Sequence, residues 1–320
     1  MANKKDDVSK IVLEVEKEIS KVVVGQRDIV RGLMRAILCN GHVLVEGVPG
    51  IAKTLIVRSI SSILGCDMKR IQFTVDLLPT DITGIMSYTP KKGFSIMKGP
   101  VFTNFILADE INRSPPKTQS ALLEAMQERE VTIARETYSL PSPFFVMATE
   151  NPLEVSGVYA LPEAQIDRFL FKLLIGYPKC EEEKKILRKN VTVNNFESYK
   201  LNALLNPKMI LNLQAQVKEV FTSEAVEEYI VKIVDETRNK EGEFGKYISY
   251  GASPRASIAL FISSKAEALM NGRDYVTPED VRVVVYPVLR HRIILNYEAE
   301  AEEITTDKVI KHILGKVNAP

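Results

Sequence analysis

Short apolar runs alternate with helix-like stretches up to about residue 178. The runs are, in chain order, His42–Glu46, Arg70–Val75, Asn104–Ala108, Pro143–Ala148 and Leu170–Ile175. Several are apolar at consecutive positions, which is typical of strands in a parallel sheet that is covered on both faces. Between two of the runs, Thr118–Glu128 carries apolar side chains at helical spacing. The alternation predicts a doubly wound α/β fold around a parallel sheet of five strands.

The pattern changes after Pro178. Glu181–Lys185 opens a region that is helical in pattern nearly throughout. Ser253-Pro254 and Thr277-Pro278 both have the form of a helix start, because Ser or Thr caps free N–H groups and Pro suits the first helical position. We therefore predict two domains, an α/β domain at residues 1–178 and an all-helical domain at residues 179–320.

Charge and composition exclude several classes of protein. The chain has 42 Lys and Arg against 41 Asp and Glu in 320 residues, whereas a general polyanion binder usually has a larger basic excess. We therefore expect no nucleic-acid partner. The three cysteines lack the spacing of metal ligands. No apolar run approaches the roughly 18 residues of a membrane span, and no apolar stretch of signal-peptide type follows the first residues. We expect a cytoplasmic protein.

The segment Gly47–Thr54, which reads GVPGIAKT, has the form of a phosphate-binding loop. It joins an apolar run to a helical stretch, so backbone N–H groups and the positive end of the helix dipole converge there. Lys53 is suited to reach the β- and γ-phosphates, and Thr54 to bind Mg²⁺. Ala52 stands where a glycine usually precedes the lysine. The residues of this loop that we predict to bind nucleotide are Gly47, Val48, Pro49, Gly50, Ile51, Ala52, Lys53, Thr54 and Leu55.

Polar residues also follow two later apolar runs. Asp109 and Glu110 come directly after Asn104–Ala108, and Asn151 comes shortly after Pro143–Ala148. Ligands of open α/β sheets bind at the carboxyl ends of the strands. We predict that Asp109 binds Mg²⁺, that Glu110 polarises the attacking water, and that Asn151 orients it. Taken singly, an Asp-Glu pair can be solvated acids, and Asn-Pro is often only a turn.

Six segments together form a pattern known from one family. They are Val24–Gln26, Gly47–Thr54, Ala108–Glu128, Ala148–Pro152, Leu161–Phe171 and Gly251–Ala256. They resemble the MoxR family of AAA+ ATPases, over most of the chain. The resemblance implies an AAA+ core with a helical lid, ATP and Mg²⁺ as cofactors, and a cytoplasmic, chaperone-like ATPase that remodels or matures protein partners. It also implies a homo-oligomeric ring, with a hexamer expected, and a von Willebrand factor A domain protein as one candidate partner.

The resemblance assigns roles to further residues. Val24, Gly25 and Gln26 resemble the turn that contacts adenine. Arg168 resembles an arginine finger, which stabilises charge on the phosphoryl group bound by a neighbouring subunit. Arg255 resembles a second sensor of the nucleotide. Its position in the first turn of a helix also favours a nearby anion, because the helix dipole disfavours a cation there. Arg113 is a further candidate for a phosphate or intersubunit contact, and solvated surface pairs remain the alternative for these arginines.

Two insertions also resemble this branch of AAA+ proteins. Asp76–Tyr88 resembles the insert that interrupts the second helix, and Glu130–Leu140 alternates as a β-hairpin does. In related rings such elements face the central pore and engage substrate. The alternative for Glu130–Leu140 is an ordinary surface hairpin.

Three other functions remain open at this point. Helicases and metal-chelatase subunits belong to related AAA+ families, so a nucleic-acid motor and a chelatase motor are alternatives. From a different class, the chain could be a nucleotide-gated scaffold that hydrolyses little ATP. The presence of Lys53, Asp109, Glu110 and Arg168 together favours an active ATPase.

Overall fold

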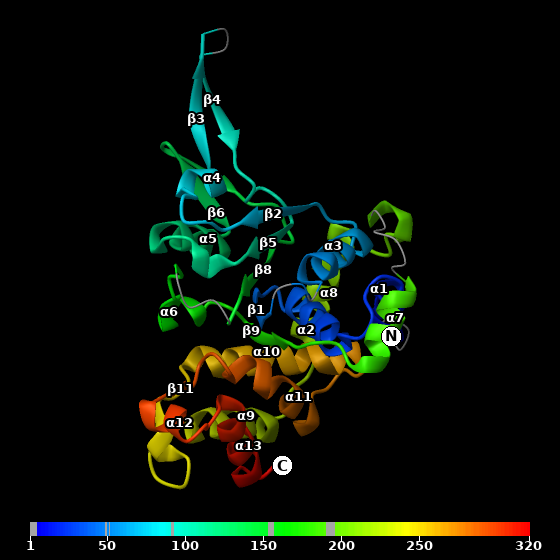
Figure 1. Cartoon of the computed structure of the whole chain (residues 1–320). Coiled ribbons are helices and arrows are strands. Elements are labelled where there is room, and N and C mark those ends of the chain that lie inside the picture. The colour runs from blue at the N-terminus through cyan, green and yellow to red at the C-terminus, as the bar shows by residue number, and fades with distance from the viewer. Residues whose placement is uncertain (1–4, 49, 51, 91–92, 153–156, 190–195) are drawn as a thin grey trace.

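A parallel sheet of five strands lies at the centre of the computed structural model (Figure 1), which describes residues 5–48, 50, 52–90, 93–152, 157–189 and 196–320. In chain order its strands are β1 (Val43–Gly47), β2 (Met68–Gln72), β5 (Phe105–Asp109), β8 (Phe145–Glu150) and β9 (Phe171–Ile175). Their order in space is β2-β5-β8-β1-β9, and every pairing is parallel. Each strand overlaps one of the five predicted runs, so the predicted sheet is confirmed.

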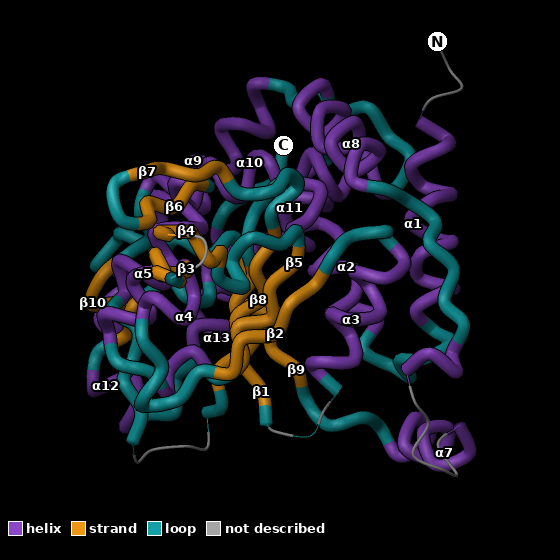
Figure 2. Tube along the Cα trace, turned by 90° about the horizontal axis from the view of Figure 1, so that it is seen from above, coloured by secondary structure: helices purple, strands orange, loops and turns teal. Residues whose placement is uncertain are grey.

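Two apolar cores cover the two faces of the sheet. Val43 and Val45 of β1 belong to one core and Leu44 to the other, because successive side chains of a strand point to opposite faces. The first core also contains residues of α1 (Lys5–Ile19), α2 (Arg27–Leu38) and α3 (Lys53–Ile63). The second contains residues of α5 (Pro116–Glu128). Figure 2 shows the strands between these two groups of helices.

The C-terminal region is mainly helical. It contains α7 (Cys180–Lys189), α8 (Pro207–Glu219), α9 (Glu224–Glu236), α10 (Pro254–Met270), α11 (Pro278–Leu289), α12 (Tyr297–Ala301) and α13 (Thr306–Lys316), and a short antiparallel pair of β10 (Ile248–Tyr250) and β11 (Ile294–Leu295). Both predicted helix starts are confirmed: Ser253 precedes α10, and Thr277 forms a capping box with Asp280 at α11. Lid helices share the first core with α1 and α2. The domain boundary near residue 179 stays a prediction.

Two β-hairpins interrupt the α/β layer. The hairpin of β6 (Glu130–Ile133) and β7 (Glu136–Ser139) confirms the prediction at Glu130–Leu140. The predicted insert Asp76–Tyr88 contains α4 (Pro79–Thr83) and most of β3 (Gly84–Thr89), and the partner strand β4 (Gly93–Lys98) extends it beyond the predicted end. The β3–β4 hairpin projects from the top of the molecule in Figure 1. The rings of Tyr88 and Phe94 contact each other there in a tilted arrangement, and the two residues are 62% and 71% exposed.

We expect the folded state to lose stability in mild acid because His42 is buried as a neutral base. Its Nδ1 accepts the N–H of Val146, so Nε2 carries the proton and donates to the carbonyl of Met126. Burial lowers the pKa of His42 from 6.5 to about 4. Protonation therefore favours the unfolded chain below pH 6.5, and stability falls as the pH drops from 6.5 toward 4. The loss is about 2 kcal/mol between pH 7.5 and 5.

Urea unfolding at pH 7.5, 6.5 and 5 measures this loss. Burial also lowers the pKa of His291, so the whole chain should lose more than His42 alone contributes. His312→Gln is the control, because that ring lies in a surface groove of the lid. A midpoint that does not change between pH 7.5 and 5 would contradict the neutral burial of both rings.

Candidate nucleotide site

The predicted phosphate-binding loop joins the end of β1 to the start of α3. Gly47 is the last residue of β1 and Lys53 the first of α3. Gly50 and Ala52 both have left-handed backbone, with φ of +83° and +63°, a conformation that favours glycine. A glycine usually precedes the lysine of such a loop because the backbone there is left-handed. Ala52 adopts this conformation although it is not a glycine. The predictions for Pro49 and Ile51 lie outside the described residues.

Lys53 turns back toward the strand that precedes it. Its side chain is buried, and Nζ donates to the carbonyl oxygen of Gly47 at 2.6 Å. Thr54 and Leu55 follow in the first turn of α3 and are half-buried. A cation and the backbone N–H groups of a helix N-terminus fit a phosphate chain. The space beside Gly50 is open, because a Cβ on this residue would have no atom within 4 Å among the described residues.

Asp109 ends β5 and is held from two sides. Its Oδ1 accepts from the hydroxyl of Thr149 at 2.7 Å, and its Oδ2 accepts from Nη2 of Arg70 at 2.6 Å. Thr149 is fully buried on β8 and also accepts the backbone N–H of Glu110 at 2.9 Å. One hydroxyl therefore fixes both members of the acidic pair.

Glu110 leaves the strand in a left-handed conformation, with φ of +56°. Its Oε2 accepts from Nε2 of Gln72 at 2.9 Å and forms an ion pair with Nη1 of Arg113 at 3.2 Å. Gln72 comes from the end of the neighbouring strand β2. The candidate residue Arg113 thus contacts the predicted water-activating carboxylate of its own chain.

Asn151 lies between the loop and the acidic pair. It directly follows β8, which is the strand between β1 and β5, and its side chain is buried. Strands are about 4.8 Å apart, so the carboxyl ends of β1 and β5 are separated by roughly 10 Å. Lys53, Asp109 and Asn151 therefore lie at one edge of the sheet, the edge formed by the carboxyl ends of β1, β5 and β8.

The Val24-Gly25-Gln26 turn lies at the same edge. Gly25 and Gln26 have φ of +71° and +56°, and Nε2 of Gln26 donates to the carbonyl of Gly176, which follows β9. Because β9 pairs with β1, this contact brings the turn next to the phosphate-binding loop. A cavity of about 390 Å³ lies beside the turn. It is lined by Ser20, Val23, Val24, Gly25, Lys185 and Arg188.

Arg168 and Arg255 lie together at the opposite edge. Both line a cavity of about 170 Å³, which also contains His42 from the residues before β1. Nη1 of Arg168 donates to the carbonyl of Leu123, and Arg255 lies 3.7 Å from Asp167. A five-residue strand is roughly 16 Å long. The two arginines are thus separated from the phosphate-binding loop of their own chain by about the length of β1.

Comparison with known proteins decides the family. Residues 42–171 match the profile described as ATPase family associated with various cellular activities (AAA), and residues 244–313 match the AAA lid domain. The chain is 46% identical to Chaperone MoxR1 of Mycobacterium tuberculosis, over 95% of this chain and 81% of that protein. It is 31% identical to Protein MoxR of Methylorubrum extorquens, over 95% and 94%. The chain belongs to the MoxR family of AAA+ ATPases.

A solved structure supports the same assignment for this MoxR-family chain. The crystal structure of a proposed ATPase from Cytophaga hutchinsonii superimposes with a TM-score of 0.91 at 47% identity. The match covers 99% of this chain and 97% of that one. The AAA+ core with a helical lid, predicted from the sequence, is therefore the fold of the whole MoxR-family chain.

Three residues that contact the acidic pair were not predicted from the sequence. Arg70, Gln72 and Thr149 hold Asp109 and Glu110 in this MoxR-family site, and they come from strands far away along the chain. The register of β2 with β5, which pairs Gln72 with Asp109, places Arg70 and Gln72 there, and the pairing of β5 with β8 places Thr149. The only signal in the sequence is their position within or directly after predicted strands, because Arg70 and Gln72 lie in the run Arg70–Val75 and Thr149 follows the run Pro143–Ala148.

The donor set suits Mg²⁺ bound together with a nucleotide. The Asp109 carboxylate and the Thr54 hydroxyl are oxygen donors, and Mg²⁺ takes few protein ligands when phosphates supply others. The described part of the chain holds no group of three His, Cys, Asp or Glu side chains arranged for a metal. Nor is any helix within the described ranges long and apolar enough to cross a membrane.

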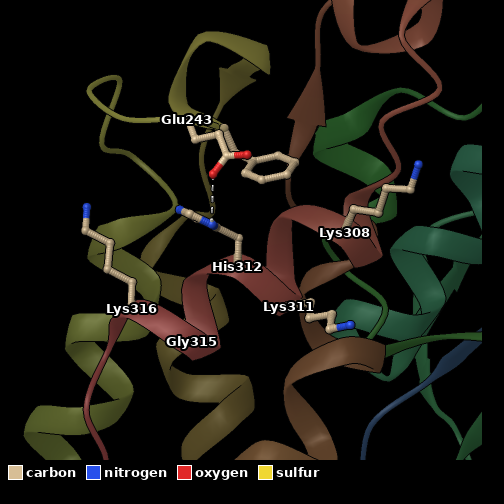
Figure 3. A pocket seen from close by; sticks show the side chains of 7 residues that line it. Glu243, Lys308, Lys311, His312, Gly315 and Lys316 are labelled. Atoms are coloured by element: carbon tan, nitrogen blue, oxygen red, sulfur yellow. Dashed lines mark ion pairs between the residues drawn. The ribbon is translucent and has the colours of Figure 1, made fainter.

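A larger cavity lies in the lid, away from the predicted site. Its volume is about 570 Å³, and most of its lining comes from α13. Figure 3 shows Lys308, Lys311 and Lys316 extending in different directions from that helix. His312 forms an ion pair of 3.9 Å with Glu243 there. The paired histidine and diverging lysines do not converge on a common point, so we assign this groove no part in nucleotide binding.

Proposed function

We propose that this MoxR-family chain hydrolyses ATP with Mg²⁺ at sites formed between neighbouring copies and uses the reaction to remodel a protein partner. The observation that carries the proposal is the split arrangement: Lys53 and the Asp109–Glu110 pair line one edge of the sheet, whereas Arg168 and Arg255 share a cavity at the other. Each chain thus holds two different halves of a site.

In the half at the carboxyl edge, Lys53 would bind the β- and γ-phosphates. Thr54 and Asp109 would hold Mg²⁺, which neutralises charge on the phosphates when bound. Glu110 would accept a proton from the attacking water, and the buried Asn151 would orient that water. The Thr149 hydroxyl holds both acidic residues, because it donates to Asp109 and accepts the backbone N–H of Glu110. Glu110 would exchange its contact with Gln72 for the water.

In the half at the amino edge, Arg168 and Arg255 would contact the nucleotide of the next chain. A guanidinium stabilises the charge that spreads over the transferring phosphoryl group. The length of a strand separates both arginines from the phosphate-binding loop of their own chain. They would therefore act on the nucleotide bound by a neighbouring chain. A closed ring, with a hexamer as the expected size, satisfies every chain in the same way.

The partner would be a protein rather than a nucleic acid. The relatives named above are called a chaperone and MoxR, and the net charge of +1 does not favour a polyanion. The β3–β4 hairpin offers exposed aromatic and aliphatic side chains for an unfolded or loosely folded segment. We propose a cytoplasmic role, with a von Willebrand factor A domain protein as one candidate partner.

ATPase activity per chain should rise with protein concentration and then level off, because dilution separates the two halves of each site. Malachite-green phosphate release, measured beside mass photometry over the same range, compares activity with assembly. Lys53→Ala should bind no ATP and show no turnover at any concentration.

The alternatives predict different results. Constant activity per chain across the dissociation range would contradict a site between copies. ATP-dependent assembly with no phosphate release would favour a nucleotide-gated scaffold. Salt-sensitive stimulation by DNA would favour a nucleic-acid motor, and stimulation by a tetrapyrrole-inserting partner would favour a chelatase motor.

A further inference from the structure

The Arg292 guanidinium is a buried junction between the lid and the α/β core. Its side chain is only 4% exposed and lies just beyond the end of α11. Nε donates to Oδ1 of Asp167 at 2.7 Å, and Nη1 donates to the carbonyls of Val288 and Leu170 at 2.6 and 3.1 Å. Nη2 donates to the carbonyls of Asp167 and Phe169 at 3.3 and 2.8 Å. Every nitrogen of the group is therefore bonded.

These bonds converge on the segment that carries Arg168. Four of the five acceptors belong to residues 167–170, between α6 (Glu163–Ile166) and β9. The carbonyls on both sides of Arg168, those of Asp167 and Phe169, are held by the same nitrogen. His291 adds a second bond to the Phe169 carbonyl at 3.0 Å. The backbone of Arg168 is thus fixed from the lid, while its side chain is exposed.

The Asp167 carboxylate extends the junction to the second arginine. Its Oδ1 binds Arg292, whereas its Oδ2 accepts from the hydroxyl of Ser253 at 3.1 Å and lies 3.7 Å from Arg255. Ser253 is the residue directly before α10, the helix whose first turn contains Arg255. One carboxylate therefore sets the positions of both predicted arginines relative to each other.

We propose that Arg292 is a positioning residue for Arg168, holding the 167–170 segment so that the finger meets the nucleotide of the neighbouring chain. The inference rests on the proposed function of Arg168. A planar fork with five N–H donors can satisfy this set of acceptors, and a lysine cannot. Displacing a positioned catalytic group by about 1 Å costs about 10²-fold in rate.

The first test is Arg292→Lys, which keeps the positive charge beside Asp167 and loses the fork. We expect kcat for ATP to fall about 10- to 100-fold with the affinity for a fluorescent ATP analogue unchanged. The matched control is Arg290→Lys, since Arg290 lies two residues earlier and binds Asp307 instead, at 2.7 and 2.8 Å. That control should keep wild-type turnover. Wild-type turnover in Arg292→Lys would overturn the inference.

Mixing variants separates positioning from general damage to the fold. Glu110→Gln keeps an intact Arg168 but cannot hydrolyse, and Arg292→Lys keeps an intact nucleotide half. In an equal mixture, half of the sites are hydrolysis-competent and half of those face an intact finger, so activity should recover to about a quarter of the wild-type rate. Arg168→Ala mixed with Glu110→Gln is the reference.

The outcomes distinguish this inference from the proposed function. Recovery in both mixtures supports both. Recovery with Arg168→Ala but not with Arg292→Lys would overturn the positioning role and leave the shared site intact. No recovery with Arg168→Ala would contradict the shared site itself. If Arg292→Lys does not fold, Asp167→Asn replaces it, because this change removes the charge that Arg292 and Arg255 share and keeps the side-chain size.

Discussion

Replacing Arg168 by alanine should lower kcat for ATP by about 10³-fold or more, the range seen when an arginine finger is removed. The affinity for ATP should stay within a few-fold of wild type. The reason is spatial: the phosphate-binding loop lies at the other edge of the sheet, so the change leaves the binding half of the same chain intact. Single-turnover phosphate release, with binding measured by a fluorescent ATP analogue, separates the two effects.

A matched change on the lid tests whether the loss of any arginine is enough to lower kcat. Arg282→Ala removes an exposed arginine of α11 that contacts the Tyr229 hydroxyl, and it should keep wild-type turnover. If Arg168→Ala hydrolysed ATP at the wild-type rate in assembled protein, Arg168 would not be the finger. Arg255, in the same cavity, would then be the next residue to change.

Glu110→Gln should bind ATP and lower kcat by about 10²- to 10⁴-fold, the usual contribution of a general base. The amide has nearly the same shape as the carboxylate, so the contact with Gln72 can persist while the ability to accept a proton is lost. Rapid-quench measurement of bound ADP and ATP would show a stable ATP complex. Asp109, held by Thr149 and Arg70, would still be available for Mg²⁺.

The control for this change is Glu124→Gln, on the exposed side of α5. It alters the net charge equally and should leave turnover unchanged. Rapid hydrolysis by Glu110→Gln would mean that another group activates the water. Loss of ATP binding would instead indicate that the carboxylate is needed to keep the edge of the sheet in shape.

The elements that were predictable from sequence are those with a local cause. Consecutive apolar residues gave the buried strands, and Ser253 and Thr277 before prolines gave the starts of α10 and α11. Of the β3–β4 hairpin, the predicted insert covered most of β3 and none of β4. Apolar side chains occur on both of its faces, as the pairs Ile85–Met97 and Tyr88–Phe94 show, so the strands lack the alternation that marks a half-buried sheet.

The candidate site was predictable only as far as its motifs extend. Lys53, Asp109 and Asn151 follow predicted strands, and parallel pairing is enough to bring them to one edge. The contacts that hold the motifs depend on register and on the path of the chain. Thr149 reaches Asp109 across 40 positions, and Arg292 reaches Asp167 across 125. No local pattern specifies contacts between residues so far apart along the chain. The roles of the site residues stay predictions.

If the two edges of the sheet are the two halves of one site, as proposed, the strand length between them decides how many complete sites an assembly can form. Two chains related by a twofold axis present the same patch to each other, and a patch holding only one half-site cannot complete the other. Head-to-tail association would complete one site at each junction. An open row of n chains then has n − 1 working junctions, and a closed ring has n. A ring that opens would lose one site outright, leaving a nucleotide pocket without its arginines at one end and an idle arginine pair at the other, although every chain stays folded.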